Sequence, residues 1–185
     1  GGLITGAGVY NDGANATIYA NPSIGYNFDH WSGDGVFDPN DANTTVTMTQ
    51  TRSVTAHFTL NTYVLNISAG SGGDTIGEGN YTHGTDANIT ATPQTGYFFA
   101  NWTGDGIADV NASTTTGDMT QDRNVTASFS INRHVLGVNA GTGGSASGSG
   151  AYDWNSSAPI TATVNAGYEF TGWTGSGISL SLIHI

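Results

Sequence analysis

The sequence predicts an all-β protein built as a tandem array of small β-sheet or sandwich-like modules that repeat every 71 residues. A Gly-Tyr-x-Phe-x-x-Trp segment occurs three times, with Trp31, Trp102 and Trp173 spaced 71 residues apart. Apolar and polar residues alternate in several short runs, and apolar residues do not recur at helical spacing over ten positions. A period this long indicates a string of small domains, because solenoid units are shorter.

The alignment of the three copies sets the expected module boundaries. Repeat 1 lacks the opening strand of the unit, because Gly1 aligns with Gly72. Residues 179–185 leave the pattern, since they do not resemble the polar loop at the same place in repeat 2. The sequence is therefore expected to be a segment of a longer array of repeats. The expected modules are residues 1–61 (repeat 1), 62–132 (repeat 2, complete) and 133–185 (repeat 3, truncated).

Repeat 2 contains the signals for a full set of strands. Its opening run is rich in β-branched and aromatic residues and ends at a glycine-rich turn. Farther on, Ala87, Ile89 and Ala91 alternate with polar residues, as in a half-buried strand. In chain order, the expected strands lie at residues 63–68, 87–92, 97–102, 114–116 and 125–129, with a short segment at residues 77–81 between the first two.

The aromatic strand is expected to supply the core of each module. Tyr97 and Phe99 share a face, whereas strict alternation places Trp102 on the other face, so we expect a bulge near residues 100–101. A unit of this size buries only about 60–65% of its unfolded surface, so these rings must contribute much of the stability. The expected core residues are Tyr26, Phe28, Trp31, Phe58, Tyr97, Phe99, Trp102, Phe129, Tyr168, Phe170 and Trp173.

Composition excludes several classes of partner and chemistry. The net charge is −11, with three Arg and no Lys, so the surface would repel nucleic acids and anionic membranes. No apolar run approaches the length of a membrane span. The absence of Cys excludes disulfides, thiolate metal sites and thiol nucleophiles.

No catalytic, cofactor or metal site is expected. The five His residues fall at unrelated repeat positions, and no acid recurs in all three copies. We therefore expect no enzymatic activity. The loop at residues 34–41 offers oxygen ligands suited to Ca²⁺, and the alternative explanation is an Asp/Asn-rich turn.

The strongest family signal combines the aromatic segment with the end of the unit. The Gly-Tyr-x-Phe-x-x-Trp-x-Gly-x-Gly segment is followed by a Thr-rich run, Met119-Thr120 and the closing strand Arg123–Phe129. Over nearly all of residues 1–178, the sequence resembles the divergent InlB B-repeat family of bacterial surface proteins. The resemblance implies extracellular tandem stalk or adhesin modules without enzymatic activity. It also implies a β-grasp-like fold as the alternative architecture.

A second signal concerns N-glycosylation. Six of nine Asn-x-Ser/Thr sequons have an acid two residues earlier, although 14 acids in 185 residues would place fewer than one there by chance. An acid at this place is similar to the extended acceptor sequence of bacterial oligosaccharyltransferases, while Asp/Asn clustering in turns is the alternative. The candidate glycosylation sites are Asn15, Asn43, Asn66, Asn80, Asn88, Asn101, Asn111, Asn124 and Asn155.

These signals together predict an extracellular structural repeat protein of the cell surface. We expect a glycosylated stalk, an adhesin segment or a fibre subunit. Its partners would be neighbouring repeats or copies of itself, including strand donation to the sheet edge left open in repeat 1. The alternative function is a carbohydrate-binding or adhesive module of a larger exported protein, with Trp154, Tyr152 or Tyr19 stacking on sugars.

Overall fold

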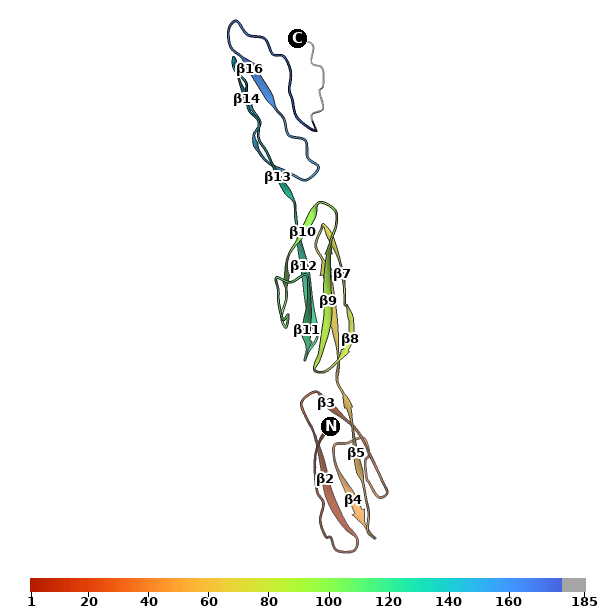
Figure 1. Ribbon diagram of the computed structural model, residues 1–185. Helices are drawn as coiled ribbons and strands as arrows, with labels where there is room; N and C mark the ends of the chain where they lie inside the picture. Colours follow the sequence, from red (N-terminus) through yellow and green to blue (C-terminus); the bar gives the residue numbers. More distant parts are fainter. Residues whose placement is uncertain (178–185) are drawn as a thin grey trace. The chain divides into compact units, whose positions relative to one another are not determined.

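The computed structural model describes residues 1–177, which form sixteen β-strands and contain no helix. The all-β prediction is therefore confirmed (Figure 1). The β-grasp-like alternative requires a helix, and the described residues have none. The chain divides into two compact units, Gly1–Ser130 and the part that begins at Ile131.

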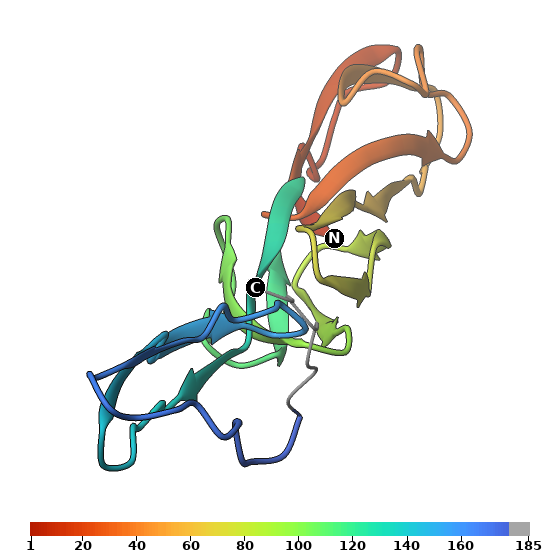
Figure 2. The same cartoon turned by 90° about the horizontal axis from the view of Figure 1, so that it is seen from above.

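Repeat 2 forms two sheets that share one core. The four-stranded sheet has the order β10-β12-β6-β8, and the three-stranded sheet has the order β11-β9-β7. The yellow-to-cyan strands of this repeat lie beside one another in both ribbon views (Figure 1 and Figure 2). The strands are β6 (Thr62–Ala69), β7 (Gly73–Ile76), β8 (Gly79–Thr82), β9 (Thr85–Pro93), β10 (Tyr97–Thr103), β11 (Thr114–Met119) and β12 (Arg123–Ile131).

Repeat 1 has the counterparts of five of the seven strands of repeat 2, in the same order, and lacks those of β6 and β8. Its sheets have the orders β1-β2-β4 and β3-β5. The strands are β1 (Gly2–Thr5), β2 (Ala14–Pro22), β3 (Tyr26–Ser32), β4 (Asn43–Met48) and β5 (Thr55–Leu60).

The described part of repeat 3 has two small sheets, β13-β15 and β14-β16. The strands are β13 (Arg133–Leu136), β14 (Gly144–Ser147), β15 (Gly150–Asp153) and β16 (Thr161–Val164). Residues 179–185, which leave the repeat pattern in the sequence, lie outside the described residues.

The opening and closing strands of repeat 2 run parallel to each other. Leu65 pairs with Arg123, and the ladder continues to Ala69 and Ala127. Only Asn61 separates β5 from β6. Its N–H donates to the carbonyl of Gly25, and its carbonyl accepts from the N–H of His83, both at 2.8 Å. The chain thus passes from the closing strand of repeat 1 to the opening strand of repeat 2 through a single residue.

The core of repeat 2 lies between its two sheets. Leu65, Val125 and Trp102 come from the four-stranded sheet and pack against Ile89 and Met119 of the other. Trp102 is 1% exposed, and its counterpart Trp31 in repeat 1 is 3% exposed. Of the other expected core residues in repeats 1 and 2, Phe28, Phe58, Phe99 and Phe129 are partly buried and pack against these cores. Tyr26 and Tyr97 are half-buried but are not among the residues that pack against either core.

A bulge brings the aromatic side chains of β3 to one side. The register with β5 shifts between Phe28 and His30, so Asp29 is the extra residue, and it aligns with Ala100 of repeat 2. As a result, Phe28 and Trp31 pack together with ring centroids 5.8 Å apart. The bulge lies where the sequence predicts one.

Two features of the structure depart from the sequence expectation. The glycine-rich turn continues as strand β7, and a Cβ at Gly73 would lie 2.2 Å from the Phe129 ring. In repeat 3, the expected core residues Tyr168 and Phe170 are 55% and 51% exposed, while Trp173 is half-buried. In repeats 1 and 2, Phe58 and Phe129 of the closing strands pack on Phe28 and Phe99, the counterparts of Phe170. Residues 131–177 contain no such strand.

Replacing Trp102 with Ala should lower the free energy of unfolding by about 3–5 kcal/mol, because the buried indole leaves a cavity. Equilibrium urea unfolding of the full chain, followed by circular dichroism, measures the change. Phe98→Ala is the matched control on the same strand, since Phe98 is 50% exposed and should change stability by less than about 0.5 kcal/mol. Equal losses for the two variants would contradict the assignment of the core.

Candidate functional site

The loop after each of the first two tryptophans is held by the indole. Nε1–H of Trp31 donates to the carbonyl of Asp41 at 3.1 Å, and Nε1–H of Trp102 donates to the carbonyl of Ala112 at 3.0 Å. In repeat 1, this loop carries the oxygen ligands suited to Ca²⁺. Asp38 and Asp41 each accept the backbone N–H two residues later, at 2.9 Å. Both carboxylates therefore have a local role in Asx turns.

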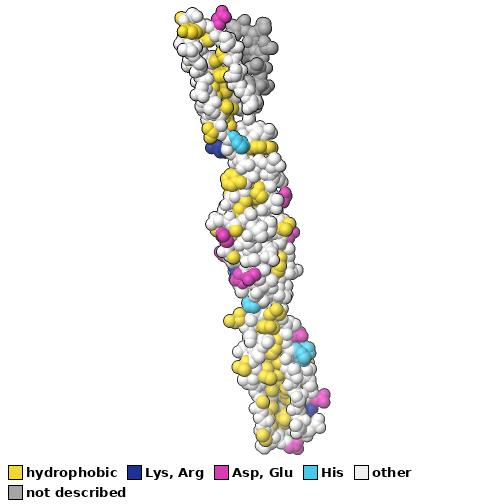
Figure 3. Space-filling model, in the orientation of Figure 1, with side chains coloured by type: hydrophobic (Ala, Val, Ile, Leu, Met, Phe, Trp, Pro, Cys, Tyr) yellow, Lys and Arg dark blue, Asp and Glu magenta, His cyan; other side chains and the backbone are white. Residues whose placement is uncertain are grey.

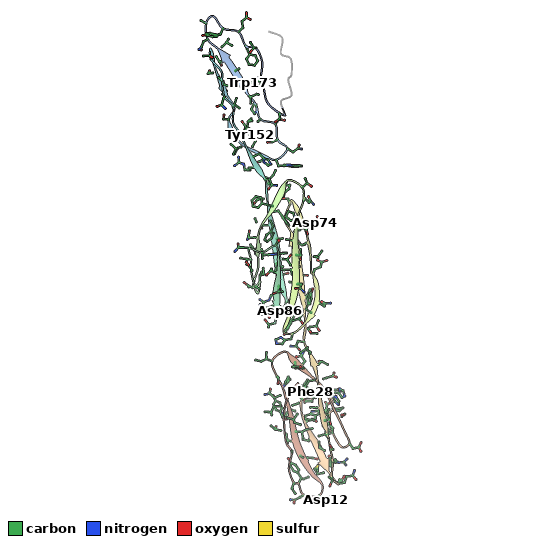
Figure 4. All side chains as sticks on the ribbon, in the orientation of Figure 1. Asp12, Phe28, Asp74, Asp86, Tyr152 and Trp173 are labelled. Carbon is green, nitrogen blue, oxygen red and sulfur yellow. The ribbon has the colours of Figure 1, made fainter. Side chains whose placement is uncertain are left out.

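The acidic residues do not gather at one place. Among residues 1–177, no group of three or more His, Cys, Asp or Glu side chains is arranged to hold a metal ion. Figure 4 shows Asp12, Asp74 and Asp86 at separate places along their modules. Acidic side chains are scattered over a surface that is mostly uncharged (Figure 3).

The candidate glycosylation sites lie mainly on the surface. Asn101 alone among them is half-buried, and its Nδ2–H donates to the carbonyl of Trp102 at 3.0 Å. Asn66 and Asn124 lie opposite each other on β6 and β12, and Nδ2 of Asn66 donates to Oδ1 of Asn124 at 3.0 Å. The exposed sites are Asn15, Asn43, Asn66, Asn80, Asn88, Asn111, Asn124 and Asn155.

Four of the six acids that precede sequons also have structural partners. Asp41 and Asp109 accept the N–H of Asn43 and Asn111, each at 2.9 Å. Asp122 accepts the N–H of Val64 at 2.8 Å, and Asp153 forms an exposed ion pair with Arg133 at 3.0 Å. The turn explanation and the glycosylation explanation therefore apply to the same residues.

The aromatic residues considered for sugar stacking have different surroundings. Tyr152 is half-buried, and its hydroxyl donates to the carbonyl of Gly148 at 2.8 Å. Tyr10 and Tyr81 make the same bond four residues back along the chain, so this tyrosine is a structural element of the repeat. Trp154 and Tyr19 are 39% and 43% exposed.

The sequence gives no hint that His30 and His57 meet. They lie directly opposite each other on β3 and β5, and their rings stack with centroids 4.3 Å apart at 9°. Oγ of Ser32 lies 2.8 Å from Nε2 of His57, while the carboxylate of Asp29 lies 3.1 Å from Nδ1 of His30. The acid thus contacts the other histidine, so a Ser–His–Asp chain is not formed. Only the long-range register of β3 and β5 could have revealed this cluster.

In repeat 1, a groove lies where repeat 2 has its opening strand, β6. We name it the first-strand groove. It has a volume of about 320 Å³ and is lined by residues that include Tyr10, Ile18, Trp31, Arg52 and Val54. In repeat 2, β6 occupies the corresponding place between β12 and β8. There Leu65 is 1% exposed, and Tyr63 and Ile67 pack against the same core.

Repeat 3 has a groove at a different position, which we name the last-strand groove. It has a volume of about 740 Å³ and lies between the segments His134–Asn139 and Trp173–Gly177. These segments correspond to β6 and to the end of β10 in repeat 2, where β12 lies between them. Figure 4 shows Tyr152 and Trp173, which both line this groove.

These features define a tandem array of small all-β modules. The chain belongs to the divergent InlB B-repeat domain family, whose model matches residues 1–62, 63–133 and 134–181. This is a family of repeats associated with bacterial surface proteins. The searches of curated proteins and of solved structures gave no match. No helix among residues 1–177 is long and apolar enough to cross a membrane.

Proposed function

We propose that the chain is a non-enzymatic, extracellular structural repeat protein that forms a stalk, an adhesin segment or part of a surface fibre. The observation that carries this proposal is the one-residue connection at Asn61, which joins the closing strand of repeat 1 to the opening strand of repeat 2. We infer that strands added to the sheets of neighbouring modules join them, as in β-augmentation. The family membership supports a location at the cell surface.

The occupant of the first-strand groove is an extended segment with the pattern of Tyr63–Ile67. In repeat 2, the apolar residues at alternate positions of this segment face the core, while Val64 and Asn66 point away from it. Without a strand between them, Arg52–Val54 and Gly8–Asn11 have no strand structure, although their counterparts in repeat 2 belong to β12 and β8. The groove therefore offers backbone groups as well as an apolar floor.

A peptide with the sequence of residues 62–69 should bind the full chain in the first-strand groove. A peptide with the sequence of residues 123–131 should bind in the last-strand groove, because β12 lies between the corresponding segments of repeat 2. NMR chemical-shift changes on the labelled chain would locate both. The control peptides keep the length and the outward residues but replace the inward residues, Tyr63, Leu65 and Ile67 in the first peptide, with Ser.

A graft distinguishes the source of the strand. Residues 62–71 placed directly before Gly1 should fill the first-strand groove from within the chain, raise the stability of repeat 1 and abolish binding of the first peptide. If the ungrafted chain also self-associates and the grafted chain does not, a second copy can supply the strand. Failure of both the peptide and the graft to change repeat 1 would overturn the proposed strand addition.

We also propose N-glycosylation of the exposed sequons, supported by their exposure and by the low charge of the surface. In material from the native source, no single molecule should carry glycans on both Asn66 and Asn124. Their amides are in hydrogen-bond contact on neighbouring strands, which lie about 4.8 Å apart. Intact-mass and glycopeptide analysis checks this, and a doubly modified peptide pair would contradict it. An unmodified native chain would refute glycosylation altogether.

A carbohydrate-binding module is the second candidate, favoured by the partly exposed ring of Trp154. A glycan array probed with the full chain should then show binding that Trp154→Ala abolishes. Tyr152→Phe is the matched control, because it removes a hydroxyl already bonded to Gly148 and keeps the ring. An array without signal would favour the structural role.

A further inference from the structure

We propose that His30 and His57 form a binding site for a nitrogen-preferring divalent transition metal, with Cu²⁺ as the best fit. The two imidazoles come from neighbouring strands and lie on the outer face of the β3-β5 sheet of repeat 1. His57 is exposed, and the side chain of His30 is 44% exposed. Imidazole nitrogens are preferred ligands of Cu²⁺, which also binds such sites more tightly than the other first-row divalent ions.

The bulge in β3 explains why these groups share one face. The register with β5 shifts between Phe28 and His30, so both Asp29 and His30 reach the outer side while Phe28 and Trp31 face the core. Ser32 follows on the same outer face. The sheet therefore holds two imidazoles, a carboxylate and a hydroxyl within contact distance, although the histidines are far apart in the chain.

The hydrogen bonds prepare the rings to act as ligands. An ionised carboxylate only accepts hydrogen bonds, so the contact of Asp29 with Nδ1 of His30 at 3.1 Å assigns the proton to Nδ1 and leaves Nε2 with its lone pair. Metal-binding histidines are commonly oriented by a carboxylate in this way. The hydroxyl of Ser32, 2.8 Å from Nε2 of His57, can accept from that nitrogen and leave Nδ1 of His57 free.

The separation of the rings suits a shared ion. Two imidazole nitrogens bound to one metal each lie about 2.0–2.1 Å from it, in the range known for zinc. Ring centroids 4.3 Å apart bring both imidazoles within reach of one ion, which they bind by turning out of their 9° stack. Water completes the coordination, because the protein offers two ligands here.

Repeat 2 supplies a natural comparison for every residue of the site. Its counterparts of Asp29, His30 and His57 are Ala100, Asn101 and Ser128. The same backbone thus accepts non-ligating residues at these positions. The variants His30→Asn, His57→Ser and Asp29→Ala should therefore fold, and circular dichroism with thermal unfolding checks this.

The test is titration of the full chain with Cu²⁺ alone, followed by calorimetry and electron paramagnetic resonance. We expect one site whose spectrum shows coupling to two imidazole nitrogens. His57→Ser and His30→Asn should each lose that two-nitrogen spectrum, and Asp29→Ala should weaken binding about tenfold. His134→Asn is the matched control, because it removes an exposed histidine on β13 and should change nothing.

A gain-of-site variant makes the test independent of any loss of folding. Asn101→His combined with Ser128→His should add a second site with the same two-nitrogen spectrum. Cu²⁺ should also raise the unfolding temperature of the original chain, because the ion binds the folded state across two strands. Equal binding and equal spectra for the original chain and the His30→Asn, His57→Ser double variant would overturn the proposal.

Discussion

The parallel pairing of β6 with β12 is the constraint on which the rest of repeat 2 depends. It brings together the two ends of the repeat, places Leu65 beside the tryptophan core and completes the four-stranded sheet. Repeat 1 shows the structure without this pair. There the counterparts of β8 and of Arg123–Val125 at the start of β12 are not strands, and Tyr10 is 36% exposed where Tyr81 is half-buried. The presence of β6 therefore accompanies strand structure in both of its neighbours, β8 and β12, which are distant from each other in the sequence.

Local sequence signals predict much of this fold and little of its assembly. The alternation of Ala87, Ile89 and Ala91 correctly predicts a strand with one buried face, and the spacing of Phe28 and Trp31 correctly predicts a bulge. These features depend on residues within a few positions of each other. The β6-β12 ladder joins residues 58 apart, as in the contact of Val64 with Asp122, and alternation alone does not select a partner or a direction.

Because local sequence signals do not select strand partners, they also predict the candidate sites only in part. Exposure of Asn88 and Asn124 follows from strand parity, which the sequence displays. The contact between Asn66 and Asn124, and that between His30 and His57, both require the register of strands that are distant in the chain. The histidine cluster also depends on differences between copies, since repeat 2 has Asn101 and Ser128 at the equivalent positions. A repeat pattern identifies the shared scaffold and conceals what only one copy carries.

The direction of β6 relative to β12 has a mechanical consequence. Because the two strands are parallel, the chain enters repeat 2 at one end of the ladder and leaves it at the other. Tension applied through the polypeptide therefore pulls these strands in opposite directions along their length. All the hydrogen bonds of the ladder, from Leu65 to Ala127, then carry the force together, instead of breaking one after another. Resistance to pulling is set by the rate of unfolding. A module closed in this way is arranged to yield slowly under load.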